Sequence, residues 1–316
     1  MGLKEVVQAI GDGVISNETT QTNAITYLIW HIRLPRIILA LLVGAGLATS
    51  GAAIQGLFRN PLADPALIGI TSGAMVFAVA GILFAGVLLQ SLNGFLGYAT
   101  ITFLAFSGSF LSTIIVYRLA TVEGHTSVST LLLAGIAITA LGGAITGLMT
   151  YYSSEDELRD ITFWTLGSLG GANWKMLAFV CPLVIGSIFI LLKNATRLDI
   201  LLLGEKEARY LGVHTQKLKW IIVGCTAMAV GVCVAVSGVI AFVALVIPHL
   251  IRLCKGTGHY NLLTGSALLG GILLVWADNF ARTAIAPAEL PIGILTALLG
   301  APFFIWLLLK SRQNFS

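Results

Sequence analysis

Charged residues are scarce in this sequence. Only 10% of its 316 residues are Asp, Glu, Lys or Arg, and 57% are hydrophobic, whereas a soluble domain carries about 25% charged residues. The mean hydropathy is +0.94. The net charge of +4 is small, and the basic residues are dispersed rather than clustered, so nucleic acid is not expected as a partner. The composition predicts an all-α, polytopic bundle of helices in a lipid bilayer.

Several patterns of catalysis and metal binding are also missing. The sequence has no GxxxxGK[ST] phosphate loop, so this chain cannot hold ATP phosphates as P-loop enzymes do. Its apolar segments contain no HExxH-type or nucleophile–base pair, which argues against an intramembrane enzyme. The cysteines lie in apolar runs without CxxC spacing and are interpreted as small hydrophobic residues; they are Cys181, Cys225, Cys233 and Cys254. We predict no catalytic residue, metal site or cofactor in this chain.

Residues 1–32 lack the apolar core of a signal peptide and mix polar residues with short apolar pieces. We interpret them as a periplasmic segment that precedes a membrane domain over residues 33–316. Hydropathy predicts nine membrane-spanning helices in that domain. They cover residues 34–58, 66–90, 95–119, 130–150, 174–193, 218–237, 239–254, 261–281 and 291–309. An odd number of crossings places the two termini on opposite sides.

The distribution of Lys and Arg predicts the orientation. With a cytoplasmic C-terminus, twelve of the 18 basic residues fall on the inside and six on the outside. The two halves also resemble each other at an offset of 187 residues, which predicts an inverted repeat with a substrate path between the halves. In a chain with 35 glycines, chance can contribute to this match. The matched positions are Gly44, Ser50-Gly51, Pro61 and Gly69 with Gly231, Ser237-Gly238, Pro248 and Gly256.

The segment from Arg33 to Gly69 combines a basic motif, an apolar helix and a polar turn. Small residues recur at every fourth position of the helix, which predicts close approach of a neighbouring helix; they are Gly44, Ala48, Ala52 and Gly56. The following turn contains two prolines, which end the helix because proline lacks an N–H group.

Two motifs in this segment, RLPR at 33–36 and SGAAIQGLFRNPLADP at 50–65, resemble the signature of FecCD-type permeases. These are subunits of ATP-binding-cassette (ABC) importers for vitamin B12, haem and ferric siderophores. The resemblance runs from about Arg33 to the C-terminus. It implies a homodimer in the bacterial inner membrane, two ABC ATPase subunits that use ATP, and a periplasmic substrate-binding protein. Most members have ten spans, so it also implies that the first family helix is absent here.

The resemblance gives one indication of the substrate. The segment FWTLGSLGG at 163–171 is most similar to the haem-importing members, so haem is favoured over vitamin B12 and ferric siderophores. This segment follows a cluster of acidic residues and is predicted to form a short periplasmic helix and turn. Residues 286–293, which contain two prolines, are expected to form an irregular element opposite it.

Three arginines lie near the outer ends of spans: Arg33, Arg36 and Arg282. From position alone they can be anchors whose charges reach lipid headgroups. The resemblance implies that they dock the binding protein through salt bridges with its glutamates. Such charges orient an acidic partner more than they hold it.

The connection 194–219 contains an amphipathic segment that can lie as a helix on the membrane surface. The resemblance implies instead a cytoplasmic coupling helix that docks into a groove of the ATPase. The residues expected to couple the two subunits are Leu203, Gly204, Glu205, Ala208, Arg209, Leu211 and Gly212.

The resemblance places a cytoplasmic gate at two turns, with Asn60 and Leu62 in one and Val128 and Ser129 in the other. Val128 departs from the family pattern, because the vitamin B12 permease has Thr there; an apolar ring can still close a pore by dewetting. From its sequence context alone, Asn60 can also be a residue that ends a helix.

Asp278 is the only acid placed within a predicted span. Arg282, four residues later, is the expected partner in a structural ion pair. The alternative is a proton relay, which would suit an ion-coupled secondary transporter. His249 follows Pro248 and has no second ligand at i+3 or i+4, so we interpret it as a packed residue and not as a metal ligand.

Overall fold

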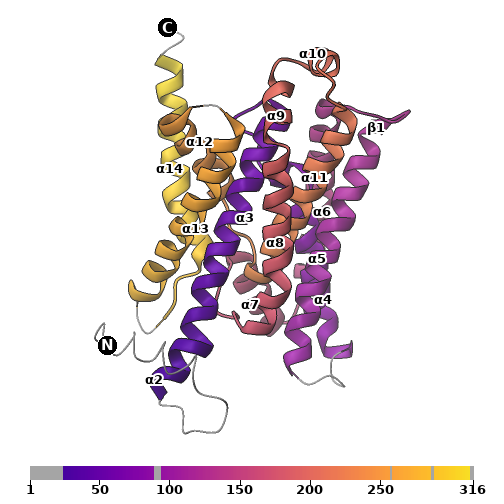
Figure 1. The fold of residues 1–316 in the computed structure, drawn as a ribbon. Helices are drawn as coiled ribbons and strands as arrows, with labels where there is room; N and C mark the ends of the chain where they lie inside the picture. Colours follow the sequence, from indigo (N-terminus) through magenta and orange to yellow (C-terminus); the bar gives the residue numbers. More distant parts are fainter. Residues whose placement is uncertain (1–23, 89–93, 257, 286–287, 314–316) are drawn as a thin grey trace.

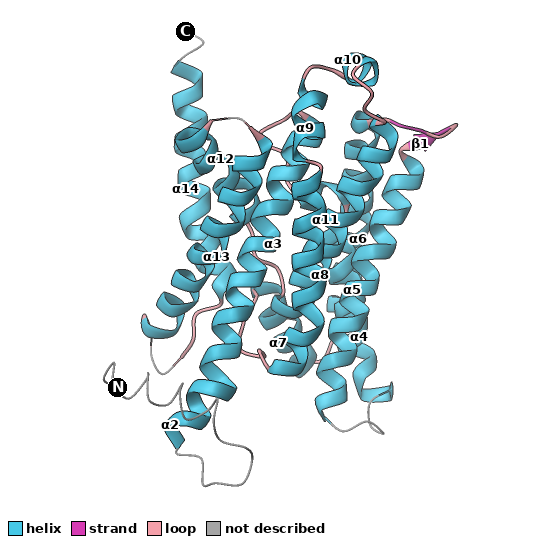
Figure 2. Cartoon of the chain, in the orientation of Figure 1, coloured by secondary structure: helices cyan, strands magenta, loops and turns pink. Residues whose placement is uncertain are grey.

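The computed structural model describes residues 24–88, 94–256, 258–285 and 288–313. Within them the chain is almost entirely helical, apart from one hairpin of strands β1 (Thr121–Val122) and β2 (His125–Thr126). Figures 1 and 2 show long helices running side by side in one bundle. The predicted all-α membrane bundle is confirmed.

Each of the nine predicted segments contains one long helix. The long helices are α3 (Leu34–Phe58), α4 (Ile70–Leu88), α5 (Gly94–Leu119), α6 (Val128–Tyr151), α8 (Trp174–Lys193), α11 (Thr215–Ser237), α12 (Val243–Lys255), α13 (His259–Thr283) and α14 (Ile292–Gln313). The short helical elements are α2 (Ala24–Tyr27), η1 (Leu28–Arg33), η2 (Pro65–Ile68), α7 (Glu155–Leu166), α9 (Ala195–Leu202) and α10 (Glu205–Tyr210).

Six helices of the described chain are long and apolar enough to cross a bilayer. They are Ala24–Phe58, Ala99–Leu119, Val128–Tyr151, Trp174–Lys193, Thr215–Ser237 and His259–Thr283. Three shorter apolar helices, at Ile70–Phe84, Val243–Cys254 and Ile292–Trp306, occupy the remaining predicted spans.

Two predicted spans begin later than expected because backbone that is not α-helical precedes each helix. The span predicted from 66 begins with the 3₁₀ helix η2 and a left-handed Gly69, so helix α4 starts at Ile70. The span predicted from 239 begins with non-helical backbone, and Phe242 has a φ of 67° before helix α12 starts. Hydropathy detects apolar residues but not the backbone conformation that interrupts them.

The predicted boundary at residue 32/33 falls inside a helix. Helix α2, the π-helical η1 and helix α3 form one continuous segment from Ala24 to Phe58. Pro35 lies at the start of α3 and has no N–H group to donate, which suits the wider π turn just before it. The rest of the predicted N-terminal segment, residues 1–23, lies outside the described residues.

The two ends of the described chain lie at opposite ends of the bundle. In Figure 1, α2 is at the bottom, whereas the last turn of α14 is at the top with α9 and α10. We call the top the inner end and the bottom the outer end, following the distribution of basic residues. This arrangement agrees with an odd number of crossings.

The small residues of α3 allow close helix contacts, as predicted. A Cβ atom at Gly44 would overlap the carbonyl group of Gly270 on α13, and one at Gly270 would overlap the carbonyl of Gly44. Gly51 meets the backbone of Ala244 on α12 in the same way, and Gly56 meets the His259 side chain. Helix α3 is therefore the central helix against which the second half packs.

This packing leads to a stability prediction. We expect Gly44→Leu to lower the free energy of unfolding by at least ~2 kcal/mol, because overpacked backbone contacts cannot relax by rotamer changes alone. Gly186→Leu is the matched control, since a Cβ at Gly186 on α8 would meet nothing within 4 Å. Thermal unfolding in detergent measures both. Equal melting temperatures for the two variants would contradict the prediction.

The two halves of the bundle contact each other reciprocally. Helix α3 packs along α13, and helix α11 packs along α5. Gly231 on α11, the match of Gly44, lies against Ser109 on α5. These contacts support an inverted repeat in which the first helix of each half packs on the third helix of the other.

The 187-residue offset is wrong as a structural register beyond the glycine pair. Gly51 lies within α3, whereas Gly238 follows the last residue of α11. Pro61 lies in a turn, whereas Pro248 lies inside α12. After its matched glycine, helix α11 continues for fewer residues than α3 does. One sequence offset therefore cannot align both the helices and the breaks that follow them.

Candidate functional site

At the outer end, Arg36 lies between two acids. Its guanidinium group donates hydrogen bonds of 2.8 and 3.1 Å to Asp278 on α13 and of 2.9 and 3.1 Å to Glu289. The side chains of Arg36 and Asp278 are only 11% and 4% exposed. The cluster joins α3 to α13 and to the segment before α14.

The predicted pair of Asp278 and Arg282 is present, but it is the weaker one. Arg282 Nε lies 3.3 Å from Asp278 Oδ2 without a hydrogen bond, and Arg282 Nη2 donates to Asn279 at 2.8 Å. Two cations therefore flank one buried carboxylate. This arrangement favours the structural pair over a proton relay, because Asp278 is already neutralised.

The three predicted docking arginines differ in accessibility. Arg33 in η1 is exposed, Arg282 is partly exposed, and Arg36 is enclosed by its two acids. Of the three, Arg33 and Arg282 are the better placed to meet a partner, and Arg36 has a structural role at the same end.

The predicted mouth element is observed as helix α7 and a turn. Ser154 caps α7 through a capping box with Glu157. The backbone N–H and then the hydroxyl of Ser154 donate to the Glu157 carboxylate and lower its pKa. The turn that follows is tied to the second half of the bundle, since Ser168 N–H donates to Ser237 O on α11 at 2.8 Å and Ile292 N–H on α14 donates to Gly167 O at 3.2 Å. A cavity of about 220 Å³ lies between this turn and the Arg36 cluster.

At the inner end, α9 and α10 lie at the top of the bundle, and the last turn of α14 reaches about the same height as α10 (Figure 1). Among the predicted coupling residues, Leu203 and Leu211 are 65% and 59% exposed, and Tyr210 beside them is 90% exposed. Ala208 is fully buried and fixes α10 to the bundle. An exposed apolar surface outside the membrane-spanning helices is a signature of a protein interface.

The other predicted coupling residues shape this segment. Gly204 and Gly212 bound α10 with φ values of 127° and 81°, which L side chains rarely adopt. Arg209 Nε donates to Thr215 Oγ1 at 3.3 Å. Glu205 Oε1 lies 2.7 Å from the buried ammonium group of Lys219 on α11.

A second polar contact fixes α9. Asp199 accepts hydrogen bonds from the backbone N–H of His259 at 2.9 Å and lies 2.6 Å from its Nδ1. His259 is 2% exposed, begins α13 and packs on Gly56 of α3. The predicted coupling segment, which comprises α9 and α10, is thus connected to α11, α13 and α3.

The predicted gate residues lie in two turns at the inner end. Asn60 and Leu62 are exposed, and Asn60 Oδ1 accepts a hydrogen bond of 2.9 Å from Leu62 N–H, so Asn60 also shapes the turn. Val128 and exposed Ser129 form the first turn of α6. The 3₁₀ helix η2 that follows the first turn packs against α6.

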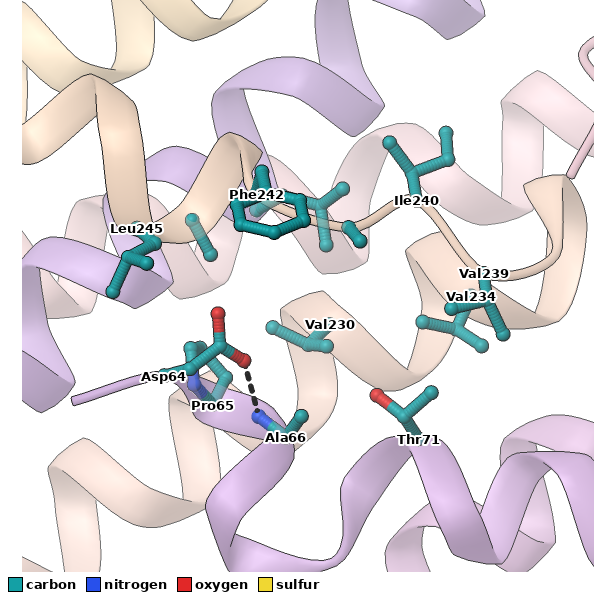
Figure 3. Close-up of a pocket in the computed structure, with 13 residues that line it drawn as sticks. Asp64, Pro65, Ala66, Thr71, Val230, Val234, Val239, Ile240, Phe242 and Leu245 are labelled. Carbon is teal, nitrogen blue, oxygen red and sulfur yellow. Dashed lines mark hydrogen bonds between the residues drawn. The ribbon is translucent and has the colours of Figure 1, made fainter. Parts of the chain in front are cut away.

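An apolar cavity of about 230 Å³ lies deeper, between the two halves (Figure 3). Asp64 and Thr71 line it from the first half, and Val234, Ile240 and Phe242 from the second. Figure 3 shows the Asp64 carboxylate accepting a hydrogen bond, 2.8 Å long, from Ala66 N–H. In the described part of the chain no three His, Cys, Asp or Glu side chains are grouped to hold a metal ion.

Sequence reasoning did not find three residues of these sites. Glu289 lies in a proline-containing segment and gave no signal, and Tyr210 was hidden within the charged run of α10. Lys219 could have been noticed, because a lysine that follows Leu218 on an apolar helix needs a partner if its face is buried.

Comparisons with known proteins agree with the geometry. The model of the FecCD transport family matches residues 2–310, a range that begins well before the Arg33 at which the motifs start. The hemin transport system permease protein HmuU of Yersinia pestis is 46% identical over 296 residues, which cover 93% of this chain and 87% of the relative. The vitamin B12 import system permease protein BtuC of Citrobacter koseri is 44% identical over 285 residues, 90% and 84% of the two chains.

A solved structure supports the same assignment. It is an ABC transporter assigned to the metal-chelate type, in an inward-facing conformation, with a TM-score of 0.82 and 35% sequence identity. The match covers 97% of this chain and 98% of that one. This chain therefore belongs to the FecCD transport family and is a multi-pass permease subunit of an ABC importer in the bacterial inner membrane.

Proposed function

We propose that this chain moves haem from the periplasm to the cytoplasm, as a homodimer with two ABC ATPase subunits and a periplasmic binding protein. The observation that carries the proposal is the coupling segment, whose exposed Leu203, Tyr210 and Leu211 offer an apolar surface at the inner end. Because the chain has no phosphate loop, ATP is hydrolysed by the subunit that docks there.

The choice of haem rests on the mouth segment at 163–171 and on the relative named for hemin transport. The chain is 46% identical to a hemin permease and 44% identical to a vitamin B12 permease. These two values are too similar to decide which of the two substrates the chain transports. Vitamin B12 and ferric siderophores are the alternative cargoes. An ion-coupled secondary transporter is disfavoured, because the intramembrane acid Asp278 is paired with Arg36.

Reconstitution tests this function. The permease, its ATPase and its binding protein are placed in proteoliposomes, and uptake of haem, cobalamin and a ferric siderophore is measured with and without ATP. We expect ATP-dependent uptake of haem only. Uptake of cobalamin alone would change the substrate, and uptake driven by an ion gradient without ATP would refute the ABC mechanism.

The turn after α10 provides a test of coupling. We expect Gly212→Leu to reduce uptake per ATP hydrolysed severalfold, because a left-handed residue with a side chain costs ~1–2 kcal/mol and reshapes the docking segment. Gly258→Leu is the matched control at the same end, since its φ is −63° and a Cβ there meets nothing within 4 Å. Unchanged coupling in Gly212→Leu would remove this turn from the docking surface.

A further inference from the structure

Lys219 on α11 is a buried cation that has no role in the function proposed above. Its side chain is 2% exposed. Its Nζ atom lies 2.7 Å from Glu205 Oε1 on α10 and donates a hydrogen bond of 2.6 Å to the carbonyl oxygen of Thr126. A buried ammonium group is strongly destabilised unless it is paired and hydrogen-bonded, so these two contacts determine its position.

Thr126 is held by the same helix through both of its backbone polar groups. Gln216 Oε1 accepts a hydrogen bond of 2.9 Å from Thr126 N–H, and Lys219 donates to Thr126 O. Gln216 and Lys219 lie three residues apart and so share one face of α11. Thr126 is also paired with Thr121 across the hairpin of β1 and β2. The backbone at Thr126 is therefore fixed to α11.

Thr126 is two residues before the gate. Ser127 follows it and caps α6, since its Oγ accepts a hydrogen bond of 3.3 Å from Thr130 N–H. Val128 and Ser129 then form the first turn of α6. The contacts thus run from the coupling helix through Glu205 and Lys219 to the backbone that begins α6.

We propose that Lys219 is a positioning residue that transmits a displacement of α10 to the gate at the start of α6. This inference rests on the proposed function, because it assumes that the ATPase moves α10. Lys219 contacts Glu205 and Thr126 with the same nitrogen atom, so α10 cannot move away without displacing Thr126 or breaking the Glu205–Lys219 ion pair. The Lys219 side of the pair is buried and the Glu205 side chain is 32% exposed, so water screens the pair only in part.

The test uses the full transporter in proteoliposomes. We expect Lys219→Met to retain ATP hydrolysis by the partner subunit but to lower uptake per ATP at least tenfold. Lys193→Met is the matched control, an exposed lysine at the inner end of α8, and it should behave as wild type. Ser129→Cys is introduced into a Cys254→Ala background for thiol labelling. We expect the labelling rate to change when ATP is added if Lys219 is present, and to stay unchanged when the protein also carries Lys219→Met.

A charge swap separates transmission from stability. In Glu205→Lys/Lys219→Glu the ion pair is restored, but a carboxylate faces the Thr126 carbonyl and cannot donate to it. We expect uptake to remain low and the melting temperature to recover only in part, because the buried carboxylate and the Thr126 carbonyl are both acceptors. Recovery of uptake in the swap, or wild-type coupling in Lys219→Met, would overturn the proposal.

Two further results keep the test decisive. If Lys219→Met does not fold, Glu205→Gln replaces it in the test, because this variant retains the side-chain volume and the hydrogen bond from Lys219 to Thr126. It should lower uptake per ATP about threefold. Wild-type coupling in Glu205→Gln would then overturn the proposal. If the wild-type transporter shows no ATP-dependent uptake, the proposed function has failed, and this outcome is distinct from an uncoupled variant beside an active wild type.

Discussion

An Arg36→Met variant should be destabilised by about 3 kcal/mol, the cost typical of removing one partner of a buried ion pair. The loss leaves Asp278, 4% exposed, and Glu289, 47% exposed, without the cation that lies between them. Arg282 compensates for this loss only in part, because its Nε is 3.3 Å from Asp278 without a hydrogen bond. Thermal unfolding of the purified permease measures the effect.

Arg33→Met is the control for this prediction, because Arg33 is exposed and lies three residues away on the same continuous helix. We expect its melting temperature to stay near the wild-type value. Adding Glu289→Gln to Arg36→Met should recover part of the lost stability, since Glu289 then carries no unpaired charge and Asp278 keeps its ion pair with Arg282. If Arg36→Met has the same melting temperature as the wild type, the cluster does not stabilise the outer end.

The positions of the helices could be predicted from sequence because hydrophobic length is a local property. The small-residue face of α3 was predictable for the same reason, since Gly44 and its neighbours repeat at helical spacing. The break before α12 was not predictable: residues 239–242 are as apolar as the helix that follows. In the structure they pack against the turn at Gly167, which lies far away in sequence.

The same distinction applies to the candidate sites. The motifs predicted sites at both ends of the bundle, but they could not assign partners to charged residues. Asp278 was paired with Arg282 because the two are four residues apart, whereas its main partner, Arg36, is 242 residues away. Likewise, the sequence located Glu205 in the coupling segment but not the lysine that it binds. Partners across the bundle follow from tertiary packing.

Arg36 is therefore unsuitable for a test of docking, because its loss would disturb the fold itself. Arg33 and Arg282 remain, one exposed and one partly exposed at the outer end. Single Arg→Ala changes should have small effects, since exposed ion pairs contribute about 0.2–1 kcal/mol. Arg33→Glu/Arg282→Glu replaces attraction of an acidic partner by repulsion, which costs several kcal/mol.

We expect this double reversal to weaken binding of the periplasmic protein at least a hundredfold, equivalent to about 2.8 kcal/mol, and to abolish most uptake. Residual uptake should rise with salt, because repulsion is screened beyond a Debye length of ~8–10 Å.

Arg159→Glu is the control for docking. Arg159 is exposed on α7 but lies among Glu155, Asp156, Glu157 and Asp160, so an acidic partner would already be repelled there and the substitution should change little. Binding of the periplasmic protein to the permease in nanodiscs measures both variants, and their melting temperatures establish that each is folded. Wild-type affinity in a folded double reversal would mean that Arg33 and Arg282 only anchor the helix ends in the membrane interface. A loss of affinity that is partly reversed by Glu→Arg changes on the partner would identify them as its docking site, because only a direct charge contact is restored by exchanging the charges.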